Sequence, residues 1–246
     1  MIIGSVREHH EKVSSTNSVA AVMLSDEKPA EGTIITASFQ KKGRGQTGNG
    51  WESEADKNLL MSIILYPVMV RAEDQFILSQ MVSLALYDLV RKETSGVRIK
   101  WPNDIYVKDD KIAGILIENS VMGNSITSCI AGIGLNVNQQ KWTGNAPNPV
   151  SLTNITGKAY DNATILNDLA QLLDERYRMI IRKESSRLSE DYHSALYRRA
   201  SWHRYIDKDG EFSGMIESAT AGGMLRVWRE NGISEDYAFK EIDYIL

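Results

Sequence analysis

The sequence has little cysteine: among its 246 residues, Cys129 is the only one. A single thiol excludes a disulfide framework within the chain and any metal site built from several cysteines. The sequence also lacks an apolar run near the roughly 18 residues that a membrane helix needs, and its start, MIIGSVREHHEK, lacks the apolar segment of a signal peptide. The formal net charge of -4 provides no basic field for nucleic acid. We therefore expect a soluble, cytoplasmic protein that binds neither membrane nor nucleic acid.

Apolar residues make up 42% of the chain and charged residues 24%, an ordinary composition for a globular protein with a real core. Helices are predicted at 73–94, 164–182 and, more briefly, 186–198, and a helix after the capping residues of 14–17. Strands are predicted at 32–40, 58–66, 97–101 and 125–138, a hairpin at 105–119 that turns at 108–111, and a long turn at 143–151. Residues 211–246 are predicted to form five short strands with glycine turns, enough for a small barrel. The pattern indicates an α+β domain followed by a small β domain.

The stretch KKGRGQTGNGW, residues 41–51, raises the question of a nucleotide site, because Gly43, Gly45 and Gly48 have the G-x-G-x-x-G spacing. A dinucleotide site of this kind needs a strand, the glycines and then a helix. The residues after Gly48 have no apolar periodicity, and a new strand begins near Asn58. About ten residues cannot supply the crossover of a parallel unit. The stretch also lacks the Walker spacing, so the sequence argues against a dinucleotide-dependent oxidoreductase.

Affinity for phosphate remains a hypothesis for the same stretch. No acidic residue lies between Gly32 and Trp51, whereas Lys41, Lys42 and Arg44 provide cations. Glycines also let backbone N–H groups approach an anion closely. The alternative is a mobile hairpin loop with incidental charge, and the stretch alone does not decide between the two.

Other polar groups stand at the ends of predicted strands, where sites are usually built. Residues 100–104, KWPND, place a cation, an amide and a carboxylate where Pro102 ends a strand, although Pro-Asn-Asp is also ordinary turn chemistry. Lys111 opens the next strand at or near the same end of the hairpin. Asn136 and Asn138 stand just past the glycines of a later strand and lie on one side of it. Each group alone would be unremarkable.

Together and in this order, the groups resemble the marks of the biotin–protein ligase family. The marks are S-T-N at Ser15–Asn17, G-R-G-x-x-G-x-x-W at Gly43–Trp51, K-W-P-N-D at Lys100–Asp104, K-x-x-G-I-L-x-E at Lys111–Glu118 and G-I-G-x-N-V-N at Gly132–Asn138. They span residues 15–138, and the remainder of the chain carries no diagnostic motif. The resemblance implies an α+β fold: a mixed-sheet catalytic domain, residues 1–198, of the kind shared with class II aminoacyl-tRNA synthetases. A small C-terminal SH3-like β barrel, residues 199–246, is implied to follow it.

Two features depart from the family pattern. Many members begin with a winged-helix DNA-binding domain, but few residues precede Ser15 here, so the resemblance predicts the ligase-only form. Many members also carry further arginines in the glycine loop, where this chain has Gln46 and Asn49. Arg44 is then the only arginine of the loop, which predicts weaker and more salt-sensitive closure of the loop over a bound ligand.

The activity implied by the resemblance is that of an ATP-dependent ligase. It would make biotinyl-5′-AMP from biotin and ATP, and would then transfer biotin to a specific lysine of a biotin carboxyl carrier protein. The implied Mg²⁺ is carried by ATP, near Asn136 or Asn138, and no resident metal is implied. The resemblance also allows a homodimer. Alternatives are a lipoate or octanoyl ligase on the same fold and a non-catalytic biotin sensor.

The resemblance also assigns roles to residues. Lys111 would contact the biotin carboxylate and the α-phosphate, Arg44 would add a second cation, and Asp104 would orient or deprotonate the acceptor lysine. The implied biotin contacts are Ser15, Thr16, Asn17, Gln40, Arg44, Gly45, Lys111 and Gly114. The implied ATP contacts are Trp51, Lys100, Asn103, Asn136 and Asn138. Three plainer interpretations stay open: a helix cap for Ser15–Asn17, a core position for Trp51 and an ordinary surface position for His9 and His10.

Overall fold

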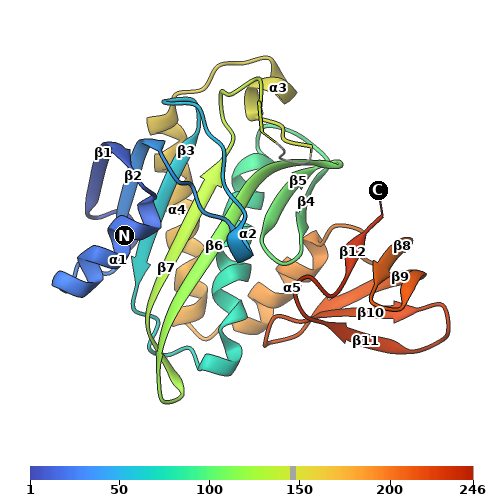
Figure 1. Ribbon diagram of the computed structural model, residues 1–246. Coiled ribbons are helices and arrows are strands. Elements are labelled where there is room, and N and C mark those ends of the chain that lie inside the picture. The colour runs from blue at the N-terminus through green and yellow to red at the C-terminus, as the bar shows by residue number, and fades with distance from the viewer. Residues whose placement is uncertain (145–147, 246) are drawn as a thin grey trace.

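A seven-stranded sheet organises the larger part of the chain (Figure 1). In the computed structural model, which describes residues 1–144 and 148–245, the strand order is β1-β2-β3-β7-β6-β5-β4. The strands are β1 (Arg7–Val13), β2 (Thr33–Gln40), β3 (Leu59–Leu65), β4 (Val97–Lys100), β5 (Asp104–Val107), β6 (Asp110–Met122) and β7 (Ser125–Leu135). The first two are parallel and are joined by α1 (Thr16–Asp26), and the other neighbouring pairs are antiparallel. The sheet is therefore mixed, as the family resemblance implied.

The two strands that flank the glycine loop bear out the argument against a dinucleotide fold. β2 enters the loop and β3 leaves it, and the two strands pair antiparallel with Thr33 opposite Ile64. A parallel unit would have needed a helix at this point. The parallel crossover lies one step earlier in the chain, through α1.

Both faces of the central strands are covered by helices, which explains their apolar sequences. All seven residues of β3, LLMSIIL, are buried. Ile64 packs with Ala20 of α1 on one face, whereas Ile63 belongs to the main core on the other. That core includes residues of α2 (Phe76–Val90), α4 (Asn162–Ile181) and α5 (Ser185–Ala195). The predicted helices therefore exist, with ends a few residues inside or outside the predicted limits.

A short helix, α3 (Leu152–Thr156), was not predicted. Five residues are too few to produce an apolar period. Its start is stabilised by a reciprocal cap between Ser151 and Asn154, and Gly157 ends it in the left-handed conformation with φ of 71°. The helix follows the predicted long turn, of which residues 145–147 lie outside the described residues.

A second sheet forms the C-terminal part of the chain, and it is antiparallel throughout. Its strands are β8 (Trp202–Asp207), β9 (Gly210–Ala219), β10 (Leu225–Arg229), β11 (Ser234–Tyr237) and β12 (Asp243–Tyr244). The prediction of five strands within residues 211–246 was wrong in detail, because β8 precedes that range and β9 is one long strand. Gly214 does not break β9: a Cβ there would lie 2.7 Å from a methyl group of Val227, so the glycine allows close packing instead of a turn.

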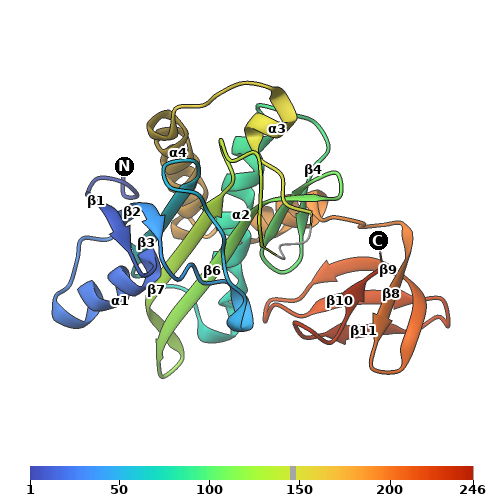
Figure 2. The same ribbon diagram turned by 45° about the horizontal axis from the view of Figure 1, so that its top comes forward.

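The second sheet packs beside the end of the first sheet that carries β4 and β5 (Figures 1 and 2). The indole of Trp101 donates a hydrogen bond to the carbonyl of Gly223 over 2.9 Å. The ring of Phe239 meets the Trp101 ring edge-on, with the ring centres 6.4 Å apart. The predicted domain boundary at residues 198 and 199 falls between α5 and β8. Among the described residues, no helix is both long and apolar enough to span a membrane.

Candidate active site

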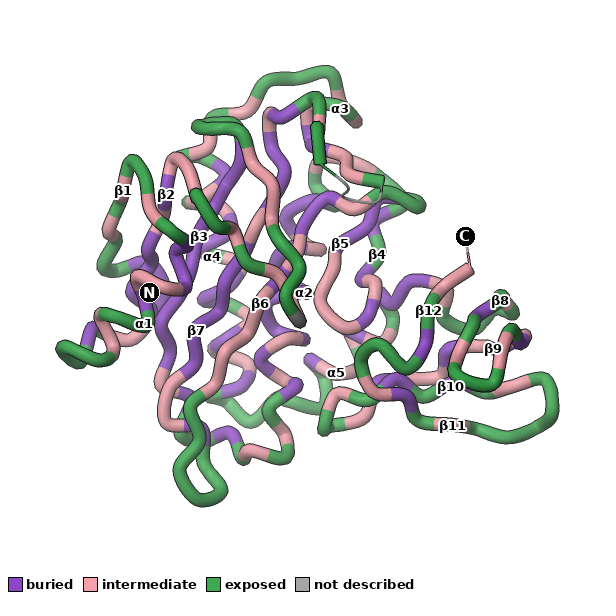
Figure 3. The backbone as a smooth tube through the Cα atoms, viewed as in Figure 1, coloured by how far each residue is buried: buried purple, intermediate pink, exposed green. Residues whose placement is uncertain are grey.

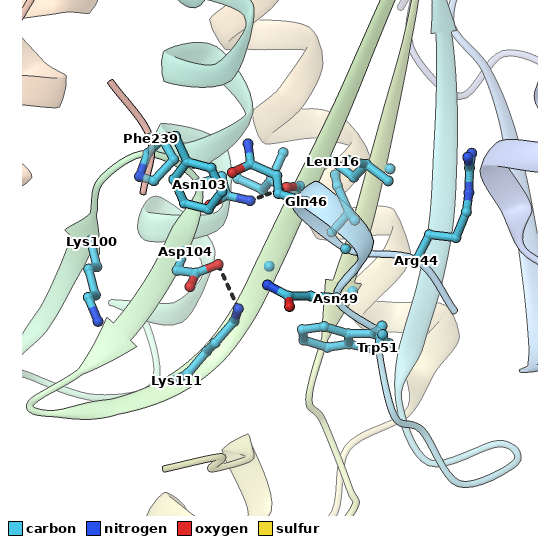
Figure 4. A pocket seen from close by; sticks show the side chains of 18 of the residues that line it. Arg44, Gln46, Asn49, Trp51, Lys100, Asn103, Asp104, Lys111, Leu116 and Phe239 are labelled. Atoms are coloured by element: carbon cyan, nitrogen blue, oxygen red, sulfur yellow. Dashed lines mark hydrogen bonds and ion pairs between the residues drawn. The ribbon is translucent and has the colours of Figure 1, made fainter. Parts of the chain in front are cut away.

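A cavity of about 350 Å³ opens between the central sheet, the glycine loop of residues 41–51 and the second sheet (Figure 4). In Figure 3 this loop is largely exposed and runs in front of the buried central strands. Twelve of the predicted site residues line the cavity: Ser15, Thr16, Asn17, Gln40, Arg44, Gly45, Trp51, Lys100, Asn103, Asp104, Lys111 and Gly114. Segments far apart in the sequence therefore meet at one place.

An ion pair between neighbouring strands lines the cavity. The Lys111 amine of β6 lies 2.8 Å from the Asp104 carboxylate at the start of β5. Burial raises the pKa of Asp104 above its ordinary value, although Lys111 and Lys100 oppose the rise. A carboxylate with a raised pKa is a better proton acceptor than an ordinary one. The pair thus combines a cation that faces the cavity with a base beside it.

Lys100, the other predicted cation, is held at the seam between the two sheets. Its amine donates to the hydroxyl of Tyr106 over 3.1 Å and lies over the rings of Tyr106 and Tyr244, 4.7 and 4.8 Å from their centres. Burial lowers the pKa of Lys100. Lys100 therefore borders the cavity while its charge is already in contact with two aromatic rings.

One end of the cavity is polar and lies against α1. The side-chain oxygen of Gln40 accepts a hydrogen bond from the Thr16 backbone over 2.7 Å. The Ser62 hydroxyl lies 2.7 Å from the Thr16 hydroxyl and 2.6 Å from the amide oxygen of Asn17. Ser15 accepts from the Ser18 backbone over 3.1 Å, so it caps α1 as well as lining the cavity. Ser62 was missed by the sequence analysis, although a polar residue inside an otherwise apolar strand was the available signal.

The guanidinium of Arg44 is not brought to the Lys111–Asp104 pair. It points away from both residues in Figure 4 and lies 2.7 Å from the carboxylate of Glu118. The same carboxylate oxygen accepts a hydrogen bond from the Asn17 amide over 2.7 Å. Gln46 and Asn49, the residues that replace the family's arginines, line the cavity instead. Glu118 was part of the sequence motif, but its partners could not be read from the sequence.

Trp51 forms a wall of the cavity because two glycines leave room for its ring. A Cβ at Gly134 would lie 2.4 Å from the indole, and one at Gly114 would lie 3.0 Å from it. The ring therefore lies directly on the backbones of β6 and β7. The Lys111 amine is 5.8 Å from the ring centre. Trp51 is half-buried, so the tryptophan both packs on the sheet and presents a surface to the cavity.

Two predicted ATP contacts lie outside the cavity. The buried side chain of Asn136 donates to the Val150 carbonyl over 3.1 Å, and Asn138 donates to the Tyr160 carbonyl over 2.9 Å. Both side chains therefore connect the end of β7 to the segment that carries α3. The predicted position of Mg²⁺, near these two residues, therefore also lies outside the cavity. Asn103, by contrast, does line the cavity, and its amide donates to the Ile115 carbonyl over 2.6 Å.

Cys129 and His10 occupy ordinary positions in the fold. Cys129 lies in the core of β7, where burial raises the pKa of its thiol to about 12. His10 lies 2.6 Å from the Glu8 carboxylate on the edge strand β1. Among residues 1–144 and 148–245, no group of three or more histidine, cysteine or acidic side chains is arranged to hold a metal ion.

Comparison with known proteins identifies this architecture as the biotin protein ligase fold. A solved structure described as biotin protein ligase from Aquifex aeolicus in complex with biotin and ATP superposes with a TM-score of 0.80 and 24% identity. The match covers 97% of this chain and 98% of that one. The chain itself belongs to the biotin/lipoate A/B protein ligase family, whose model matches residues 10–136.

Two curated relatives support the same family. The bifunctional ligase/repressor BirA of Bacillus subtilis is 32% identical over 186 residues, which are 72% of this chain and 55% of that protein. The biotin–[acetyl-CoA-carboxylase] ligase of Mycobacterium tuberculosis is 28% identical over 185 residues, which are 74% of this chain and 67% of that protein. The matched region thus spans about half the length of the first of these relatives.

Proposed function

We propose that this protein is a biotin–protein ligase. It uses ATP, with Mg²⁺ bound to the ATP as part of that substrate, to convert biotin into biotinyl-5′-AMP. It then transfers the acyl group to a lysine of a biotin carboxyl carrier protein. The observation that carries the proposal is the Lys111–Asp104 pair, 2.8 Å apart, in a cavity that has a polar pocket at one end and a tryptophan wall beside the pair.

In the first step a biotin carboxylate oxygen attacks the α-phosphorus of ATP, and the bond to pyrophosphate breaks. Two anions must approach each other, so a fixed cation between them stabilises the transition state. Lys111 suits this role because it lies on a strand and its amine lines the cavity. Lys100 and Asn103 border the same region, and the ring of Trp51 offers a flat surface for the adenine.

In the second step the amine of the acceptor lysine attacks the carbonyl of the mixed anhydride, and AMP leaves. The amine must lose a proton to become the amide. Asp104 is suited to accept it, because burial raises the pKa of its carboxyl and makes it more basic than an exposed carboxylate. No nucleophile of the enzyme is needed, since the anhydride is already activated.

The polar end of the cavity favours biotin over lipoate, the other acid that the family name covers. The ureido group of biotin carries both donors and an acceptor, whereas the dithiolane ring of lipoate carries neither. Thr16 and Asn17 lie in the hydrogen-bonded group around Ser62 and can form hydrogen bonds with the ureido group. A pocket built from polar groups rejects a ligand that leaves them unpaired.

The test is a transfer assay with purified protein, MgATP and a biotin carboxyl carrier domain, read by intact mass. We expect a gain of one biotinyl group on the carrier, and no gain without ATP. Parallel reactions with lipoate and octanoate, and with a lipoyl domain as acceptor, separate the two ligase activities. Transfer of lipoate at a rate equal to that of biotin would contradict the proposal, and binding of biotin without any transfer would favour a sensor.

A further inference from the structure

The glycine loop is a folded hairpin. The Gly45 backbone N–H donates to the Asn49 carbonyl over 2.6 Å, and the Trp51 N–H donates to the Gly43 carbonyl over 3.0 Å. A short 3-10 helix, η1 (Gln46–Gly48), forms its tip. Four glycines give such a hairpin a high entropic cost of ordering, so contacts outside the hairpin have to help hold it.

One such contact is the pair between Arg44 and Glu118, which we call the clasp. Arg44 is the only arginine of the loop, and its guanidinium lies 2.7 Å from the Glu118 carboxylate on β6. The two side chains are 43% and 37% exposed, so water can reach the pair. Ion pairs of this exposure are weak and screened by salt. The clasp can therefore open and close readily, as a loop over a substrate must.

Glu118 also controls the orientation of Asn17. A carboxylate only accepts hydrogen bonds, so the Asn17 amide must turn its nitrogen toward Glu118, 2.7 Å away. Its amide oxygen then faces the Ser62 hydroxyl at 2.6 Å. Gly132 allows this arrangement, because a Cβ there would lie 2.2 Å from that amide oxygen. Glu118 thus determines that the nitrogen of the Asn17 amide points toward Glu118 and its oxygen toward Ser62.

The clasp closes a chain of hydrogen bonds around the polar end of the cavity. From Glu118 the contacts run through Asn17 and Ser62 to Thr16, and from there to Gln40. Gln40 is the last residue of β2, directly before the loop. Gln40, directly before the loop, and Arg44, within it, are therefore connected to each other through the residues that would hold the acid.

We propose that Glu118 is a positioning residue that clasps the glycine loop over the bound acid through Arg44 and orients Asn17 beneath it. On this proposal Arg44 acts as the attachment point of the loop, and the cation at the reacting phosphate is Lys111. The inference rests on the proposed function for the nature of the ligand, but the clasp itself is a property of the ligand-free protein.

The first experiment uses the ligand-free protein, so it does not depend on the proposed function. Hydrogen exchange of the loop amides is compared in wild type, Glu118→Gln and Arg44→Gln. We expect exchange about threefold faster in both variants, and an equal rise in the wild type when salt is raised. Glu73→Gln is the matched control, because it removes an exposed carboxylate that pairs with Arg71, a residue outside the loop. Unchanged exchange in Glu118→Gln would overturn the clasp.

The second experiment measures how fast preformed biotinyl-5′-AMP leaves the enzyme, in a double-mutant cycle. Glu118→Gln keeps an oxygen that can accept from Asn17 but loses the charge that holds Arg44. If the clasp holds the loop, each single variant and the double variant release the adenylate at the same rate, about threefold faster than wild type and with little salt dependence. If Arg44 instead touches the ligand, its substitution adds to that of Glu118 and the proposal fails. A wild type that makes no adenylate would refute the proposed function, while the exchange experiment would still decide on the clasp.

Discussion

The amine of Lys111 lies 2.8 Å from the carboxylate of Asp104, across the hairpin that joins β5 to β6. The two residues are seven positions apart in the sequence, and each faces the same cavity. Because neighbouring strands hold the pair, its geometry is fixed by the sheet. The two half-reactions of the proposed ligase should therefore respond differently to changes at these two positions.

Replacing Lys111 with alanine should reduce adenylate formation by at least about 100-fold, because the fixed cation at the reacting anions is lost. Biotin-dependent release of pyrophosphate measures this step. The melting temperature should stay within about 3 °C of wild type, since no core volume is removed. Lys208→Ala, at an exposed turn of the second sheet, is the control for loss of a positive charge. Pyrophosphate release within a few-fold of wild type would rule out this role.

Replacing Asp104 with asparagine should slow transfer to the carrier more than adenylate synthesis. The change keeps the size of the side chain but removes the base. In wild type, transfer should fall as the pH drops through the pKa of Asp104, which burial raises above the ordinary value of 3.8. The variant should lose this acidic limb. Single-turnover transfer from isolated adenylate, measured against pH, checks the prediction, and equal losses in both half-reactions would contradict it.

Ser62→Ala should raise the KM for biotin about tenfold with little change in kcat. The substitution leaves the Thr16 hydroxyl and the Asn17 amide without their common partner. Discrimination of biotin against lipoate should fall in the same variant. Ser83→Ala is a close control, because the Ser83 hydroxyl is equally buried but has no hydrogen-bond partner among the described residues. An unchanged KM would mean that the polar end of the cavity does not hold the ring.

Gly134→Ala should displace the indole of Trp51, since the new Cβ would lie 2.4 Å from it. We expect the KM for ATP to rise about tenfold and the protein to lose roughly 1–3 kcal/mol of stability through overpacking. Gly222→Ala is the control, because a Cβ at Gly222 meets no atom within 4 Å. Steady-state kinetics and thermal unfolding measure both effects. Normal ATP kinetics in this variant would show that Trp51 does not contribute to the nucleotide site.

The sequence was sufficient to predict those elements whose apolar pattern is strong. The run NLLMSIILY predicted β3, and the helical spacing after Thr164 predicted α4. β1, with the sequence REHHEKV, was not predicted, because it is a polar edge strand whose pairing with β2 depends on the crossover through α1. Period and composition do not encode such a pairing.

The candidate site, like the fold, could be predicted from the sequence only in part. The sequence motifs brought twelve predicted residues to one cavity, because each motif stands at a strand end or next to one. The directions of individual side chains could not be predicted from spacing. Asn136 and Asn138 share a side of the chain, yet both are directed at loop carbonyls. Arg44 carries the charge that the loop needs, but the acid that receives it lies 74 residues away.

The position of Lys100 has a consequence for how the two sheets stay together. Its amine is enclosed by Tyr106 of one sheet and Tyr244 of the other, and burial lowers its pKa from 10.5. If the second sheet separated, water would reach the amine and its affinity for a proton would return. Separation is therefore coupled to proton uptake, and association of the sheets to proton release. The association should tighten as the pH rises from the lowered pKa toward 10.5, and lowering the pH through that same range should loosen the side of the cavity that the second sheet forms.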